Sequence, residues 1–191
     1  MSPAPTEPLT ALDASLRERL RAELNRLLRS LGITAIYVTH DQAEAMSLGD
    51  RIVVMRKGAV TQIGTPREIY FEPANRFVAE FVGAANIIEA EAAEGFVRLA
   101  GGKLTIADKS VTGSVVAMVR PEAIAVVAPE GADIVGQVET ASFVGDRQRL
   151  VVAGAAGRPL VIDAPNTIVV HAGMRVGLSV DPQAVRLLPK G

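Results

Sequence analysis

The stretch Ile33-Thr34-Ala35-Ile36-Tyr37-Val38-Thr39-His40-Asp41-Gln42-Ala43-Glu44 decides the fold predicted for the first part of the chain. Its first six residues are mostly apolar and partly β-branched, which predicts a strand buried on both faces of a parallel sheet. Asp41 suits the N-cap of a following helix, with Glu44 three residues later as its capping-box partner. His40 is therefore expected at the carboxyl edge of a sheet, where α/β proteins bind ligands.

Helical and turn patterns surround this stretch. Leucines recur at three- and four-residue steps from Leu16 to Leu31, which predicts an amphipathic helix that Asp13 caps and Gly32 ends. Downstream, Lys57-Gly58 between two apolar runs predicts a tight hairpin. Thr65-Pro66 and Asn75 are each expected to begin a short helix.

From about residue 86 the apolar period changes from that of a helix to that of a strand. Ten short segments between Ile87 and Leu188 are separated by Gly and Pro, which predicts a small β-barrel or sandwich. The segments 119–124 and 180–185 repeat one pattern, an apolar strand followed by a proline corner. We therefore expect an α+β chain of two domains, a partial α/β domain in residues 1–83 and an all-β domain in residues 84–191.

Composition excludes several classes of function. The formal net charge of -1 and the scarcity of aromatic residues give no reason to expect nucleic acid as a partner. The absence of Cys excludes disulfides and thiolate metal sites, and the segment after His40 lacks the second His of a zinc motif, so no metal site is predicted. No apolar run is long enough to predict a membrane-spanning helix.

Taken alone, His40 is better explained as a structural residue at a strand end than as a ligand-binding one. Its neighbours change that interpretation, because residues 37–46 closely resemble the switch-histidine segment of the ATP-binding subunits of ABC transporters. The resemblance is strongest to bacterial importers for sugars, polyamines, iron or phosphonates. Residues 50–55 and 62–66 continue it in register, and residues 7–13 resemble the end of the Walker B motif running into the D-loop.

The resemblance implies roles for single residues. His40 would contact the γ-phosphate of ATP, and Asp13 would lie in the D-loop, although a plain helix cap also explains Asp13. Glu7 would match the carboxylate that polarises the attacking water, although a tail residue is the better explanation here. For the intact family the resemblance also implies ATP and Mg²⁺ as cofactors. Membrane permease subunits and a solute-binding protein would be partners, and the subunit would lie on the cytoplasmic face of the membrane.

The second half resembles the regulatory domain, of TOBE or OB-like (MOP-like) type, that this importer subfamily carries. The resemblance rests on residues 119–122, 143–146 and 180–182. Related β modules bind small oxyanions, and a polar cluster between two predicted strands is the candidate site, although an ordinary polar turn explains it better. The cluster consists of Thr140, Ser142, Gly145, Asp146 and Arg147.

Parts of the family pattern are absent. The sequence has no G-x-x-x-x-G-K-[ST] phosphate loop and no Leu-Ser-Gly-Gly-type signature, and Thr6 stands where a Walker B aspartate is expected. We therefore expect the C-terminal portion of an ATP-binding subunit that alone neither binds nor hydrolyses ATP. The alternative is a non-enzymatic module that dimerises or senses a ligand through its β domain. An unpaired strand at 33–38 further predicts self-association. The transported solute is not indicated.

Overall fold

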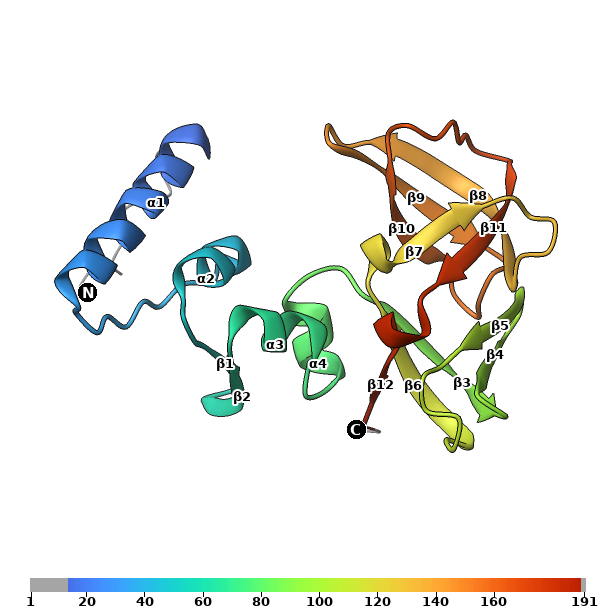
Figure 1. Cartoon of the computed structure of the whole chain (residues 1–191), viewed down its shortest axis with the longest axis horizontal. Helices are drawn as coiled ribbons and strands as arrows, with labels where there is room; N and C mark the ends of the chain where they lie inside the picture. Colours follow the sequence, from blue (N-terminus) through green and yellow to red (C-terminus); the bar gives the residue numbers. More distant parts are fainter. Residues whose placement is uncertain (1–13, 190–191) are drawn as a thin grey trace. The chain divides into compact units, whose positions relative to one another are not determined.

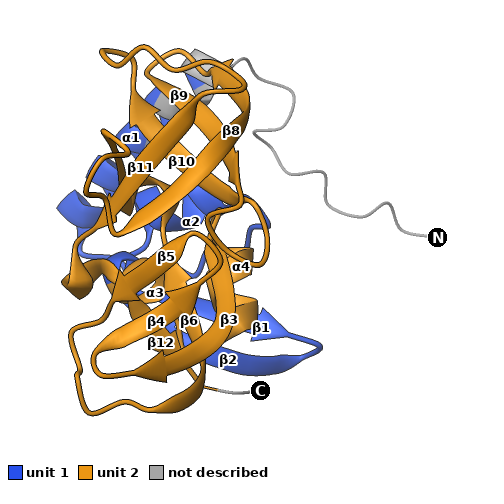
Figure 2. Cartoon of the chain, turned by 90° about the vertical axis from the view of Figure 1, so that its right-hand side faces the viewer, with its two compact units in different colours: residues 1–67 blue, residues 68–191 orange. Residues whose placement is uncertain are grey.

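The computed structural model describes residues 14–189, and the chain forms two compact units divided between Arg67 and Glu68 (Figure 2). The first unit contains helices α1 (Ala14–Leu31) and α2 (Gln42–Leu48) and a hairpin of β1 (Ile52–Arg56) and β2 (Ala59–Gly64). The second contains helices α3 (Pro66–Phe71, which begins at the division) and α4 (Arg76–Phe81) and a large sheet (Figure 1). The predicted domains 1–83 and 84–191 stay a prediction, because compactness alone does not test them.

Helix α1 confirms the predicted amphipathic helix. Gly32 has φ 61°, and its N–H donates to the Arg29 carbonyl at 3.3 Å while the Ile33 N–H donates to the Leu28 carbonyl at 3.4 Å. A left-handed residue at this position closes a helix by satisfying its last carbonyls, and glycine adopts it without steric cost. The leucines of the apolar stripe stay exposed, so this face of α1 is not packed into a core.

The predicted strand at 33–38 is wrong. The segment has no regular secondary structure, and no described strand pairs with it. Its apolar side chains face solvent, with Ile36 93% and Val38 86% exposed. A strand needs a neighbour to accept and donate its backbone hydrogen bonds, and apolar β-branched residues cannot supply that neighbour. The α/β sheet predicted for this part of the chain is therefore not confirmed.

The hairpin of β1 and β2 is confirmed with the predicted turn. Lys57 and Gly58 have φ 50° and 79°, the left-handed pair that a two-residue type I′ turn requires. The strands pair antiparallel from Ile52 opposite Gly64 to Arg56 opposite Ala59, with a bulge at Val54/Met55.

The second unit contains all ten predicted strands, in one curled antiparallel sheet (Figure 1). The order is β10-β9-β8-β5-β4-β3-β6-β12, and β11 pairs with β7 and β8. The strands are β3 (Asn86–Ala93), β4 (Phe96–Leu99), β5 (Gly102–Thr105), β6 (Gly113–Val119), β7 (Ile124–Val127), β8 (Ile134–Phe143), β9 (Arg147–Ala153), β10 (Leu160–Pro165), β11 (Arg175–Val180) and β12 (Arg186–Leu188). The curled sheet agrees with the predicted OB-like β domain.

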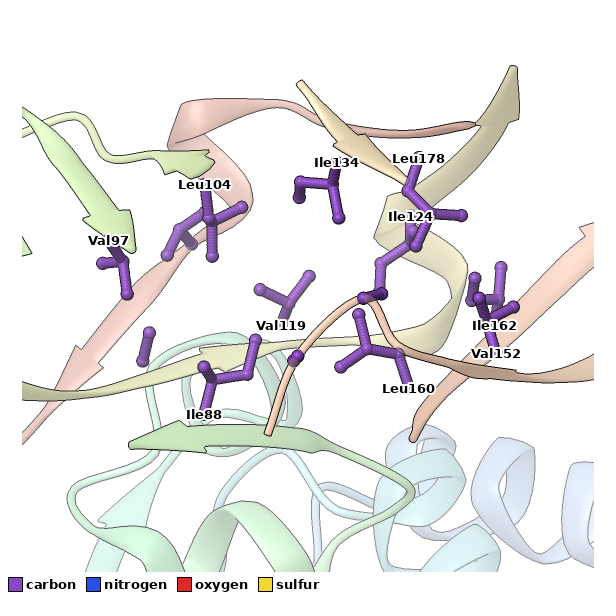
Figure 3. Packing of buried hydrophobic residues seen from close by; sticks show 14 of the residues in the cluster. Ile88, Val97, Leu104, Val119, Ile124, Ile134, Val152, Leu160, Ile162 and Leu178 are labelled. Atoms are coloured by element: carbon purple, nitrogen blue, oxygen red, sulfur yellow. The ribbon is translucent and has the colours of Figure 1, made fainter. Parts of the chain in front are cut away.

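One apolar core fills the inside of this sheet. Figure 3 shows side chains from strands far apart in sequence meeting there, among them Val97, Leu104, Ile162 and Leu178, which are at most 2% exposed. Each such side chain stabilises the fold by about 1.5–3 kcal/mol relative to exposure. Where β5 meets β8 the backbones approach closely, since a Cβ at Gly101 would collide with the Val135 carbonyl oxygen.

The two predicted proline corners have the same conformation. Each is a single 3-10 turn, η1 (Pro121–Ala123) and η2 (Pro182–Ala184), closed by an i to i+3 backbone hydrogen bond. The strand before each corner pairs with the strand after the other: β6 with β12, and β11 with β7. The sequence repeat therefore builds a local two-fold arrangement within one chain.

Arg120 breaks the symmetry of the repeat, because Asp181 occupies the equivalent position. Arg120 is 3% exposed, and its guanidinium donates to the carbonyl oxygens of Tyr70, Ala79, Gly83 and Ala84 at 2.7–3.2 Å. It also stacks on the Tyr70 ring at 4.0 Å. A cation at the carboxyl ends of α3 and α4 satisfies carbonyls that the helices leave unpaired. Arg120 therefore fixes both helices onto the β-sheet.

The Tyr70 hydroxyl completes this arrangement by donating to Glu122 at 2.8 Å. Burial and this hydrogen bond raise the pKa of Tyr70 to about 12, so the phenol stays protonated and remains a donor. Burial is also the main influence on the guanidinium, and it lowers the pKa of Arg120 without removing its charge.

Replacing Arg120 is expected to destabilise the second unit. Arg120→Met keeps the side-chain length but leaves four buried or part-buried carbonyls without this donor, which should lower the free energy of unfolding by about 3 kcal/mol or more. Urea unfolding followed by tyrosine fluorescence in a Tyr37→Phe background reports this unit, because the chain then has Tyr70 as its remaining tyrosine and no Trp. Arg98→Met, at an exposed position in β4, is the control. Equal destabilisation by both variants would contradict the role of Arg120.

Candidate functional site

His40 lies in a turn between the extended segment 33–38 and helix α2. Its residue surface is exposed, whereas Thr39 and Asp41 on either side are half-buried. The turn ends where α2 begins, at the predicted N-cap: Asp41 Oδ1 accepts from the Glu44 N–H at 3.1 Å. His40 thus lies directly before a helix start, as predicted. The strand predicted on its other side is not among the described strands.

Three further hydrogen bonds tie the turn together. The Thr39 hydroxyl donates to Glu44 Oε2 at 2.8 Å and accepts from the Asp41 N–H at 2.9 Å. The Tyr37 hydroxyl donates to the same carboxylate oxygen at 3.1 Å. Glu44 is 6% exposed, an unusual burial for a carboxylate, which hydrogen bonding to donors makes tolerable.

The capping-box prediction for Glu44 therefore needs a correction. In a capping box the carboxylate returns to the N–H of the N-cap residue, but the Asp41 N–H donates to Thr39 and the Glu44 carboxylate accepts from two hydroxyls. The signal that could have indicated this is the spacing of Tyr37, Thr39 and Glu44. Alternation in an extended segment puts the first two on one side.

The other residues assigned by resemblance cannot be placed next to His40. Glu7 and Asp13 lie outside the described residues, so the water-polarising carboxylate and the D-loop stay predictions. Within residues 14–189, the described side chains form no group of three His, Asp or Glu that could hold a metal ion. The same residues include no helix long and apolar enough to cross a membrane.

The predicted polar cluster of the β unit lies along the end of β8, the following loop and the start of β9. Thr140 and Ser142 are exposed on β8, Gly145 turns the loop with φ 91°, and Asp146 and Arg147 follow it. Arg147 donates to both oxygens of Asp146 at 2.9 and 3.0 Å and lies 3.2 Å from Asp163 on β10. The cation of the cluster therefore already has two carboxylate partners. The ligand site itself stays a prediction.

The sequence analysis did not predict the bidentate ion pair of this region. Arg149 donates through two nitrogens to the two oxygens of Asp163, at 2.8 and 2.9 Å, and the two residues are directly opposite in the β9–β10 ladder. Such bidentate pairs are among the stronger protein hydrogen bonds. Hydrogen bonding from Arg149 lowers the pKa of Asp163, and the same bonds raise the pKa of Arg149.

This pair is expected to make stability depend on acid pH. The pKa of Asp163 is lower in the folded than in the unfolded chain, so its contribution is present above about pH 4 and disappears as the pH falls through the folded pKa. Asp163→Asn should lower the free energy of unfolding by about 1 kcal/mol near neutral pH. Between about pH 5 and pH 3 the free energy of unfolding should decrease less in this variant than in the parent chain.

Urea unfolding across that pH range measures the effect. Asp133→Asn is the matched control, because Asp133 is exposed and pairs loosely with Lys103 at 3.9 Å. An acid limb with the same slope in Asp163→Asn as in the parent chain would contradict the assignment.

Residues 117–188 match the TOBE domain family. This match runs from the last residues of β6 to the end of β12 and includes both proline corners. It confirms the resemblance of the second half to a TOBE domain.

The whole chain is similar to longer proteins. It is 40% identical over 187 residues to the spermidine/putrescine import ATP-binding protein PotA of Clostridium novyi, covering 96% of this chain and 53% of that protein. It is 48% identical over 149 residues to the sulfate/thiosulfate import ATP-binding protein CysA 2 of Chromobacterium violaceum, covering 75% and 41%. The Fe(3+) ions import ATP-binding protein FbpC of Rhizobium etli is 39% identical over 163 residues, covering 82% and 46%. The chain thus spans about half the length of the curated relatives it matches.

Proposed function

We propose that this chain, a homologue of the C-terminal region of ABC importer ATP-binding subunits, supplies the switch-histidine segment and the regulatory domain of such a subunit. The observation that supports the proposal most directly is the geometry around His40. His40, an exposed residue, lies in a turn held by hydrogen bonds, directly after an apolar segment that has no strand partner among the described residues. In the proposed setting the missing partners come from the other half of the subunit.

In this setting His40 donates a hydrogen bond to the γ-phosphate of ATP. Phosphoryl transfer depends chiefly on positioning and on stabilising charge at the phosphate oxygens, which an imidazole N–H can do. ATP and Mg²⁺ are held by the complete subunit, which works at the cytoplasmic face of the membrane with permease subunits and a solute-binding protein. The relatives are named for three different solutes, so we assign none to this chain.

The chain alone is expected not to bind ATP, because the phosphate-binding loop supplies most of the contacts to the nucleotide. Titration calorimetry with magnesium-ATP should give no binding heat. Micromolar binding by the 191-residue chain would contradict this part of the proposal.

Joining the chain to the preceding half of a relative tests the role of His40. A fusion to the part of Clostridium novyi PotA that precedes its match should hydrolyse ATP. His40→Ala should then lower kcat by about 100-fold or more, as loss of one transition-state donor does elsewhere. Arg98→Met, at an exposed position of β4, is the control and should keep the parent rate. An active fusion with unchanged kcat in His40→Ala would remove His40 from the mechanism.

Self-association of the chain alone is part of the same proposal. The exposed apolar run at 33–38 should be buried between copies when no other partner is present. Val38→Lys is expected to shift the population toward monomer in sedimentation velocity. Val169→Lys is the matched control, because both valines are 86% exposed and Val169 lies in a loop of the β unit. A monodisperse monomer of the parent chain would count against this prediction.

A further inference from the structure

Hydrogen bonds between residues of the segment 37–44 hold the turn around His40. Thr39 uses its hydroxyl twice, as donor to Glu44 Oε2 and as acceptor from the Asp41 N–H. Asp41 in turn accepts from the Glu44 N–H. The three residues therefore form a closed ring of hydrogen bonds, and His40 lies inside the chain segment that the ring encloses.

Burial gives this ring its strength. A hydroxyl has one hydrogen to donate, so the bond to a buried carboxylate fixes its direction and leaves its lone pairs facing the Asp41 N–H. Hydrogen bonds to a charged acceptor are about twice as strong as neutral ones. The second hydroxyl, from Tyr37, reaches the same oxygen and ties the ring to the extended segment.

A helix cap alone does not account for this arrangement. An N-cap needs one bond, from the Glu44 N–H to Asp41, and that bond would leave the Glu44 side chain free to extend into solvent. The side chain is instead buried and directed back past His40 to residues 37 and 39. These two contacts are therefore to residues that precede His40.

We propose that Glu44 is a positioning residue for His40, acting through the Thr39 hydroxyl, and that this turn is preformed without the strand pairing of residues 33–38. The inference rests on the proposed function, because a fixed His40 has a use only if it meets a phosphate. Its own content is the order of the turn in the free chain, which is measured without nucleotide.

The experiment is NMR of the isotopically labelled 191-residue chain, which has two His residues. The imidazole signals of His40 report the turn, and those of His171, in a loop of the β unit, serve as an internal reference. Amide exchange at Asp41 reports the bond to Thr39, and amide exchange at Gly49, which donates to the Ala45 carbonyl, reports the end of α2.

Two matched variants separate positioning from helix stability. Thr39→Val has nearly the same shape but no hydroxyl, and should speed exchange of the Asp41 amide about tenfold or more and move the His40 signals. Thr39→Ser keeps the hydroxyl and should stay close to the parent chain. Glu44→Ala should reproduce the effect of Thr39→Val. Gln42→Ala should change neither the exchange of the Asp41 amide nor the His40 signals. His171 and Gly49 should be unaffected by either Thr39 variant.

Three results would overturn the proposal. The first is free exchange of the Asp41 amide in the parent chain, which would mean that the turn is not preformed. The second is an unchanged His40 signal in Thr39→Val, and the third is equal disturbance by Thr39→Ser and Thr39→Val. If Glu44→Ala also unfolds α2, the comparison of Thr39→Val with Thr39→Ser tests the proposal instead. Failure of the proposed function would appear separately, as ATP hydrolysis by the fusion protein that does not depend on His40.

Discussion

Backbone pairing is the constraint on which this structure depends. A segment becomes a strand where another strand satisfies its N–H and C=O groups, and the described chain provides such a neighbour for β1, β2 and the strands of the β unit but not for residues 33–38. In the β unit the ten strands find neighbours in one curled sheet around a shared core. Residues 33–38 have an equally apolar sequence but no described neighbour, so they remain extended and exposed. Composition favours a strand in both places, and pairing determines where one forms.

The same requirement explains Arg120. Helices α3 and α4 end without further turns to satisfy their last carbonyls, and one buried guanidinium donates to four carbonyl oxygens there. Because Arg120 directly follows β6, these two helices are fixed to the β-sheet. The proline repeat creates two equivalent positions, one before each corner, which Arg120 and Asp181 occupy. Only Arg120 can donate to helix carbonyls, so the helices pack at its corner.

Local signals in the sequence predicted much of this fold. Lys57-Gly58 determines its turn through its own backbone angles, Gly32 and Asn75 act within one helical turn, and alternation located all ten strands of the second unit. The errors and omissions concern distant partners. Periodicity could not show that residues 33–38 lack a neighbour. Neither the Asp163 partner of Arg147 and Arg149 nor the carbonyls around Arg120 could be found from nearby residues. Glu44 was assigned to the right helix start, but its carboxylate contacts depend on the path of the preceding segment.

We propose that residues 33–38, which form no strand in the free chain, pair as a strand when the other half of an ATP-binding subunit is present. Amide hydrogen exchange at Ile36 and Val38 tests it most directly, in the free chain and in the fusion to the preceding half of Clostridium novyi PotA. We expect fast exchange in the free chain and strong protection in the fusion, with the β unit unchanged between them. Equally fast exchange at both residues in a folded fusion would contradict the claim.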